Sequence, residues 1–215
     1  MHKRQMMINS RFNLVLCCLI GIACDSLWGA EEEGRERAGW GDVFAKAKVE
    51  GTIAIFDLRN DAKERRVFNP ARAAKRFTPA STFKIPHALI ALDTGAVRDE
   101  FEVIPWDGKK RDYEPWNEDQ NLRSSMRHSV VWVYEGFAEK IGTEREADSL
   151  KKLGYGNQKV TGDAPFWISG DLAISANEQV IFLVELYFNR LPFDEAHQRL
   201  VKDIMLIEAG KDWRL

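Results

Sequence analysis

The sequence predicts an α+β protein, because helical periodicity dominates, one β-hairpin is evident and no β-α-β alternation occurs. The hairpin pairs residues 51–58, which are β-branched and apolar, with residues 65–68, and residues 59–62 form its turn. Residues 99–121, rich in Pro, Gly, Trp and charge, are expected to form a long loop. Apolar spacing and capping signals predict helices over residues 38–48, 80–93, 130–141, 144–153, 180–188 (after a capping box at 175–178) and 192–207.

Length and charge fit one domain with a sizeable core, since 45% of the 215 residues are apolar. The 31 basic and 33 acidic residues nearly cancel, which gives no reason to expect a nucleic-acid partner or an anionic membrane.

The N-terminus is typical of an export signal, with a basic start followed by an apolar run over residues 14–23. Ten residues are too few to span a bilayer, so we expect a cleaved signal peptide over residues 1–30 and a mature domain over residues 31–215. The protein is therefore expected to be periplasmic or secreted. A lipoprotein is the alternative, because Ile22-Ala23-Cys24 partly matches a lipid-attachment box, although Gly21 fits that box badly.

Cysteine and histidine positions argue against a metal site. All three cysteines lie in the signal region, so the mature domain has neither a disulfide nor a thiolate metal site. Its histidines form no H-E-x-x-H pair, which makes a catalytic zinc site unexpected; they are His87, His128 and His197.

Ser81 and Lys84 form an S-x-x-K motif at the start of a predicted helix, one turn apart on one face. Apolar neighbours would desolvate Lys84 and lower its pKa, so that it can act as a neutral base for the Ser81 hydroxyl. The alternative is an ordinary serine at a helix N-terminus. A second S-x-x-K, Ser149 to Lys152, follows a run of charges and is expected to lie on a solvated helix face.

Four ordered elements resemble the class D serine β-lactamases, or oxacillinases. Taken alone, each element could be an ordinary helix start, turn or core segment. Together, in the family's order and spacing, they are specific to this family. The resemblance runs from Trp40 to the end of the chain. The elements are the nucleophile helix at residues 78–95, the S-x-V motif Ser129-Val130-Val131, the Y-G-N motif Tyr155-Gly156-Asn157 and the segment Phe166-Trp167.

The resemblance implies a β-lactamase and penicillin-binding type of fold, with a helical region beside an antiparallel sheet. It implies hydrolysis of penicillin-type antibiotics through an acyl-enzyme, with no metal and no cofactor other than CO₂ or bicarbonate for carbamylation of the lysine. The implied roles are Ser81 as nucleophile, Lys84 as N6-carboxylysine and general base, Ser129 as proton shuttle, Trp167 as donor to the carbamate, Val131 as a wall that keeps the pocket dry, and Tyr155 and Asn157 as supporting or substrate-binding residues.

One expected element is missing from the sequence. The family carries a K-T-G or K-S-G motif on a late strand, whereas Thr94-Gly95 here follows Asp93 and Thr161-Gly162 follows Val160. We therefore expect a domain truncated at its C-terminus, without the later strands of the sheet. Two alternatives to a working hydrolase stay open: a penicillin-binding sensor that is acylated without turnover, and an inactive remnant.

Overall fold

The computed structural model describes residues 39–59, 64–162 and 165–211, which lie within one compact unit, residues 34–215. The signal-peptide prediction for residues 1–30 and most of the predicted hairpin turn lie outside the described residues. Within the described ranges, no helix is both long and apolar enough to cross a membrane.

Helices form most of the described structure, as predicted. In chain order they are α1 (Trp40–Ala47), α2 (Pro70–Ala74), the 3₁₀ helix η2 (Ala80–Phe83), α3 (Lys84–Asp93), the 3₁₀ helix η3 (Glu114–Trp116), α4 (Leu122–Arg127), α5 (Val131–Ile141), α6 (Thr143–Leu153), α7 (Phe166–Ser169), α8 (Ala176–Tyr187) and α9 (Glu195–Ile204).

Two small antiparallel sheets complete the α+β fold. The predicted hairpin is confirmed as β1 (Ile53–Asp57) paired with β2 (Glu64–Phe68), in a register that places Ile55 opposite Arg66. The second sheet pairs β3 (Arg76–Phe77) with β4 (Ile174–Ser175) and so joins the start of the nucleophile segment to the start of α8. Among the described residues, neither sheet has a third strand.

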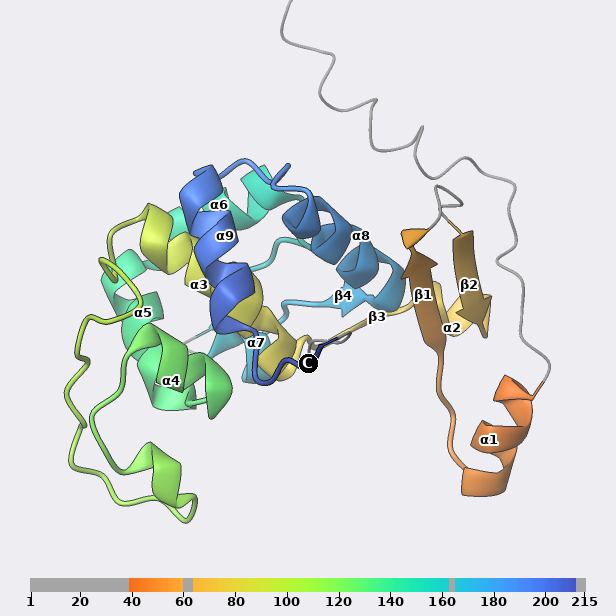
Figure 1. Cartoon of the computed structure of the whole chain (residues 1–215), viewed down its shortest axis with the longest axis horizontal. Coiled ribbons are helices and arrows are strands. Elements are labelled where there is room, and N and C mark those ends of the chain that lie inside the picture. Colours follow the sequence, from red (N-terminus) through yellow and green to blue (C-terminus); the bar gives the residue numbers. More distant parts are fainter. Residues whose placement is uncertain (1–38, 60–63, 163–164, 212–215) are drawn as a thin grey trace, which may run out of the picture. The chain divides into compact units, whose positions relative to one another are not determined.

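Helix α3 lies at the centre of the helical region and packs against α4, α5 and α9 (Figure 1). Eight of its ten residues are buried, because its sequence from Ile85 to Leu92 is apolar apart from His87. A helix that is apolar all round belongs in a core rather than on a surface. The start of α3 therefore holds the S-x-x-K lysine against a closely packed interior.

The nucleophile helix differs from its prediction at both its start and its proline. Residues 80–83 form the tighter 3₁₀ turn η2, and the α-helical part begins only at Lys84. Pro86, an interior position of the predicted helix, lies in the first turn of α3, where a backbone N–H has no partner within the helix. The irregular geometry is thus concentrated around Ser81.

The last helix is shorter than residues 192–207. It begins at Glu195, because the Asp194 side chain accepts a hydrogen bond from Ala196 N and caps the helix. The helix α2 was not predicted: Asn69, directly after the end of β2, is its N-cap, and Pro70 is in its first turn.

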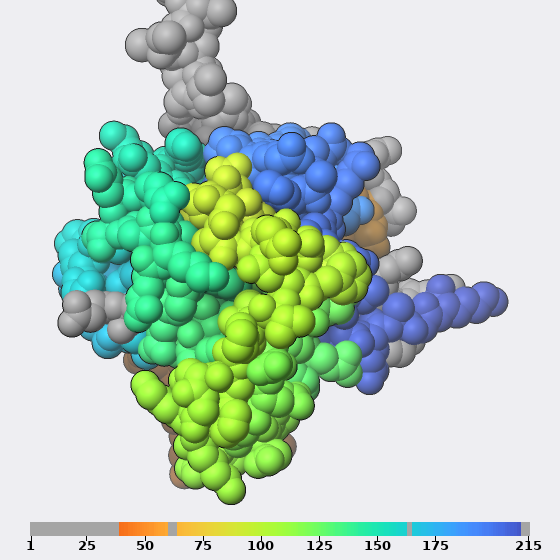
Figure 2. Space-filling model, turned by 90° about the vertical axis from the view of Figure 1, so that its left-hand side faces the viewer, coloured from red at the N-terminus to blue at the C-terminus, as the bar shows by residue number. Residues whose placement is uncertain are grey.

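The long loop over residues 99–121 is confirmed, apart from the short turn η3. An isolated bridge between Ile104 and Gln120 closes its two ends. In the space-filling view, this light-green segment forms the lower part of the visible face (Figure 2). It leads directly into α4 and the S-x-V motif, so it frames one side of the site.

Candidate active site

Three predicted site residues meet at the Ser81 hydroxyl. Lys84 Nζ donates to Ser81 Oγ at 3.1 Å, and Ser129 Oγ donates to the same oxygen at 3.0 Å. Ser81 is exposed on η2, whereas Lys84 is buried behind it. One exposed hydroxyl in contact with a buried amine and a second hydroxyl is the arrangement that an activated serine nucleophile requires.

The backbone beside these hydroxyls is strained. Ala80, just before the nucleophile, has φ of 47°, and Ser129 has φ of 54°. Both fall in the left-handed region, which costs a residue with a Cβ about 1–2 kcal/mol. Such outliers persist where the surrounding packing enforces them, and they cluster at functional sites. Here they aim two side chains at a single point.

The buried setting of Lys84 changes its acidity. Its side chain is 1% exposed, and its Nζ lies 5.4 Å from the ring centroid of Tyr134, a neighbour that the motifs alone did not reveal. Burial lowers the pKa of Lys84 from 10.5 to about 8, although the Glu135 carboxylate acts in the opposite direction. With that pKa, roughly a tenth of the amine is neutral at pH 7, far more than for an exposed lysine.

Trp167 lies in the short helix α7, which packs against η2. The indole is fully buried and stacks on the Phe83 ring with 5.5 Å between ring centroids. Its Nε1 is buried and has no hydrogen-bond partner among the described residues. Buried donors are nearly always satisfied. The indole stacks on Phe83, the residue directly before Lys84. Its unpaired N–H could therefore donate a hydrogen bond to a polar group attached to Lys84.

The S-x-V motif contributes residues to both the core and the site. Val130 is fully buried, while Val131 is half-buried and begins α5. The motif thus places the hydroxyl of Ser129 toward Ser81 and anchors the same stretch of backbone in the core.

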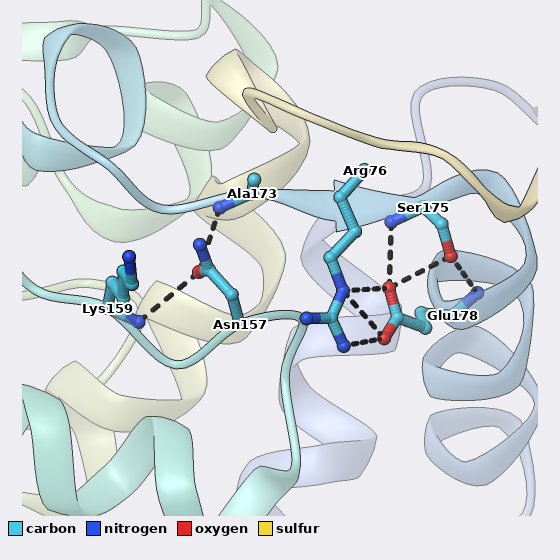
Figure 3. A network of polar contacts seen from close by, with 6 residues as sticks. All are labelled: Arg76, Asn157, Lys159, Ala173, Ser175 and Glu178. Atoms are coloured by element: carbon cyan, nitrogen blue, oxygen red, sulfur yellow. Dashed lines mark hydrogen bonds and ion pairs between the residues drawn. The ribbon is translucent and has the colours of Figure 1, made fainter.

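The Y-G-N motif supports the site from behind. Tyr155 is 1% exposed, and its hydroxyl donates to Gln179 Oε1 at 2.9 Å. The Asn157 amide is bound to backbone: Oδ1 accepts from Ala173 N at 3.0 Å (Figure 3). Nδ2 donates to Asp171 O at 2.6 Å. Neither side chain offers a free polar atom to a substrate in this structure, which favours supporting roles.

The sequence predicted only one part of a polar network that lies beside this motif. Glu178 forms the predicted capping box with Ser175 and also receives the Arg76 guanidinium (Figure 3). Burial alone would raise the pKa of Glu178, but Arg76 and Ser175 hold it below its ordinary value. Arg76 lies 102 residues away, so no local pattern could have identified it. The network ties β3, just before the nucleophile, to α8.

The second S-x-x-K is not a site, but the expectation about Ser149 is wrong. Ser149 is 4% exposed rather than solvated, because α6 turns that position toward the core. Its hydroxyl donates to Arg145 O at 2.7 Å. The hydroxyl is therefore occupied, and Lys152 lies exposed.

Residues 39–59, 64–162 and 165–211 contain no group of three or more His, Cys, Asp or Glu side chains that could hold a metal ion.

Comparison with known proteins places this arrangement in a family. The model of the penicillin-binding protein transpeptidase domain matches residues 46–213. β-Lactamase OXA-20 of Pseudomonas aeruginosa is 52% identical over 191 residues, which cover 88% of this chain and 72% of that protein. β-Lactamase OXA-48 of Klebsiella pneumoniae is 44% identical, over 85% of this chain and 68% of that protein.

Solved structures agree with these relatives. The class D β-lactamase FUS-1 (OXA-85) of Fusobacterium nucleatum subsp. polymorphum superposes with a TM-score of 0.80 and 37% identity, over 84% of this chain and 75% of that one. BPu1 β-lactamase gives a TM-score of 0.75 and 47% identity, over 79% of this chain and 72% of that one.

Proposed function

Because this chain belongs to the class D β-lactamase family, we propose that it hydrolyses the β-lactam ring of penicillin-type antibiotics through an acyl-enzyme on Ser81. The observation that carries the proposal is the convergence of Lys84 Nζ and Ser129 Oγ on the exposed Ser81 oxygen. The same convergence supports the roles proposed below for each of these residues.

In the acylation step, Ser81 Oγ loses its proton toward Lys84 and forms a bond to the lactam carbonyl carbon. The ring C–N bond then breaks, and the departing nitrogen takes a proton from Ser129, which lies 3.0 Å from the nucleophile. Ser129 is reprotonated by the proton that Lys84 took from Ser81. In the second step, a water oxygen adds to the acyl carbon and the bond to Ser81 breaks. Ser81 regains its proton, so one water is consumed for each ring opened.

We propose that Lys84 carries a carbamate in the working enzyme. The neutral amine would form an N–C bond to CO₂ and lose a proton, and the resulting N6-carboxylysine supplies an anionic oxygen as general base. Three features of the chain support this: the lowered pKa of Lys84, its burial, and the unpaired Trp167 Nε1 that can donate to a carbamate oxygen. Val131 would limit water access beside the lysine, while Tyr155 and Asn157 would hold the surrounding backbone.

We further propose that residues 1–30 are a cleaved signal peptide and that the mature enzyme, residues 31–215, acts in the periplasm or outside the cell. Determination of the mature N-terminus after expression in a Gram-negative host tests this. An uncleaved, cytoplasmic product would contradict it.

Steady-state hydrolysis of benzylpenicillin, followed by ultraviolet absorbance with and without added bicarbonate, tests the proposed function. We expect turnover that rises with bicarbonate and that is lost in Ser81→Ala and Lys84→Ala. Ser149→Ala, in the second S-x-x-K, is the matched control and should keep the wild-type rate if it folds. Turnover that persists in Ser81→Ala would overturn the proposal.

A further inference from the structure

A buried histidine and carboxylate lie behind the nucleophile helix and take no part in the steps above. His87 is on α3, one turn beyond Lys84, and Glu146 is on α6; their exposed fractions are 0% and 1%. His87 Nε2 lies 2.6 Å from Glu146 Oε1. The contact lacks the alignment of a hydrogen bond, and no other described residue offers these atoms a hydrogen bond. We therefore treat it as a close contact between an imidazole and a carboxyl group, both withdrawn from solvent.

Such a pair is costly to bury, so its presence calls for an explanation. Taking an ionised carboxylate out of water is unfavourable unless a partner compensates it, and well-packed apolar residues would often serve stability equally well. The pair therefore contributes something that apolar packing does not. A contact of 2.6 Å between two buried side chains restricts the orientation of both groups.

The group that this pair orients is the His87 ring, and the ring contacts Trp167. The His87 and Trp167 rings meet edge to face, with 5.0 Å between centroids. Trp167 also stacks on Phe83. Phe83 and His87 are four residues apart and lie on either side of Lys84 in sequence, so the indole spans the stretch of helix that carries the lysine.

We propose that the His87–Glu146 pair is a positioning unit that fixes the Trp167 indole and thereby sets how readily Lys84 takes up CO₂. The inference rests on the proposed function, because it needs a carbamate that accepts from Trp167 Nε1. Outer-shell partners of this kind orient a group that itself contacts the reacting atoms. Neither His87 nor Glu146 is hydrogen-bonded or ion-paired to Ser81 or Lys84. Of the rings that His87 meets, Trp167 is the one with an unpaired buried donor, so we assign the effect to Trp167.

The pair also has a route to solvent. Glu146 lines a pocket of about 210 Å³ between α5, α6 and the following loop, together with the exposed Glu139 and Thr143. The carboxylate itself is buried, and this adjacent pocket offers space for water when the pair is broken. A variant that disrupts the pair can therefore hydrate the cavity rather than unfold, which makes the proposal testable by substitution.

The experiment measures the bicarbonate concentration that half-saturates the ¹³C carbamate NMR signal of the full-length protein in ¹³C-bicarbonate. Glu146→Gln keeps the shape and removes the charge. We expect a roughly tenfold rise in that concentration, by analogy with the loss of outer-shell partners at metal sites. Saturating bicarbonate should restore the wild-type kcat for benzylpenicillin. The matched control, Glu139→Gln, changes an exposed carboxylate on the same pocket and should leave both values unchanged.

Combining Glu146→Gln with a substitution of Trp167 distinguishes a positioning role of the pair from a general loss of packing. Trp167→Phe should raise the bicarbonate requirement by itself, and adding Glu146→Gln to it should cause no further rise. Should Glu146→Gln fail to fold, the double variant His87→Leu/Glu146→Leu removes both charges with apolar replacements and should show the same raised requirement.

Two results overturn the inference in distinguishable ways. An unchanged bicarbonate requirement in folded Glu146→Gln, or a fully additive effect with Trp167→Phe, overturns the positioning role alone. A wild-type protein with no carbamate signal at saturating bicarbonate overturns both this inference and the carbamate of the proposed function.

Discussion

An ammonium group that is enclosed by aromatic side chains loses its hydration, and the 1% exposed Lys84 is such a group. Its neutral form is favoured for the same reason, which makes the amine both a base and a nucleophile toward CO₂. Ser81 needs the opposite environment, because its oxygen must reach a substrate. The 3₁₀ turn η2 provides both, since it leaves Ser81 exposed while Lys84 enters the core.

The pKa of Lys84 predicts how stability depends on pH. Because the pKa is lower in the folded protein (about 8) than in the unfolded chain (10.5), the unfolded state binds more protons between these values. The free energy of unfolding should therefore rise as pH increases from about 8 to 10.5, by about 3 kcal/mol in total. Urea titrations in CO₂-free buffer measure this contribution as the difference from Lys84→Met. Parallel pH profiles for the two proteins would contradict the lowered pKa.

Ser129 offers a test that separates hydroxyl chemistry from backbone strain. Ser129→Ala and Ser129→Gly both remove the hydroxyl, and each should lower kcat for benzylpenicillin by about a hundredfold or more. Because Ser129 has φ of 54°, Gly fits the backbone better than Ala, and Ser129→Gly should melt at the higher temperature. Near-normal turnover in Ser129→Gly would show that the hydroxyl is dispensable.

At the scale of elements, the site depends on two connections between distant segments. The β3–β4 pair and the Arg76–Glu178 contact join the nucleophile segment to α8. The Y-G-N turn is bound to the strand leading into β4 through Asn157 and Ala173. Both connections lie behind Ser81 rather than in contact with it, so they fix the frame that holds the nucleophile.

Gly156 is the tightest point of that frame. A Cβ at Gly156 would lie 2.2 Å from Ala173 O, and its φ is +54°. Gly156→Ala should therefore lower the free energy of unfolding by about 3 kcal/mol, through strain and steric overlap together. Gly154→Ala is the matched control, because Gly154 has φ of +62° with open space around it and should lose only about 1–2 kcal/mol. Equal losses in chemical denaturation would contradict the close approach.

The sequence could predict those elements whose capping or composition pattern lies within their own segment. The capping box at Ser175 and the β-branched, apolar composition of β1 are contained in their own segments, and the elements they predict were confirmed. Two-residue strands and the four-residue helix α7 are too short to show periodicity, so tertiary packing alone defines them. The same holds within the site. Ser81, Lys84 and Ser129 stand in motifs, whereas Glu146 reaches His87 only through the packing of α6 on the core.

At the scale of the whole described unit, stability is distributed unevenly. The core centres on α3, α5 and the aromatic cluster around Phe83, and most of α3 is fully buried. The β1–β2 hairpin is different, since β1 contains no buried residue and only Val67 of β2 is buried. A two-stranded hairpin is marginal by itself and depends on what it packs against, here α8 and α2.

Native-state hydrogen exchange should reveal this difference. Amides of β1 and β2 are expected to exchange at least about tenfold faster than those of α3 and α5, by local opening that leaves the site intact. Mass spectrometry of peptides from the two regions, at several denaturant concentrations, provides the comparison. Equal protection in both regions would instead place the hairpin in the same cooperative unit as the site.

The central claim, that Ser81 is acylated and then released, is tested most directly by intact-mass spectrometry of the purified protein after addition of benzylpenicillin in bicarbonate buffer. We predict an adduct of the drug's mass that maps to Ser81, decays as free drug is consumed and is absent in Ser81→Ala. A permanent adduct on Ser81 would indicate a penicillin-binding sensor that does not turn over. No adduct on Ser81, with the protein folded, would contradict the account.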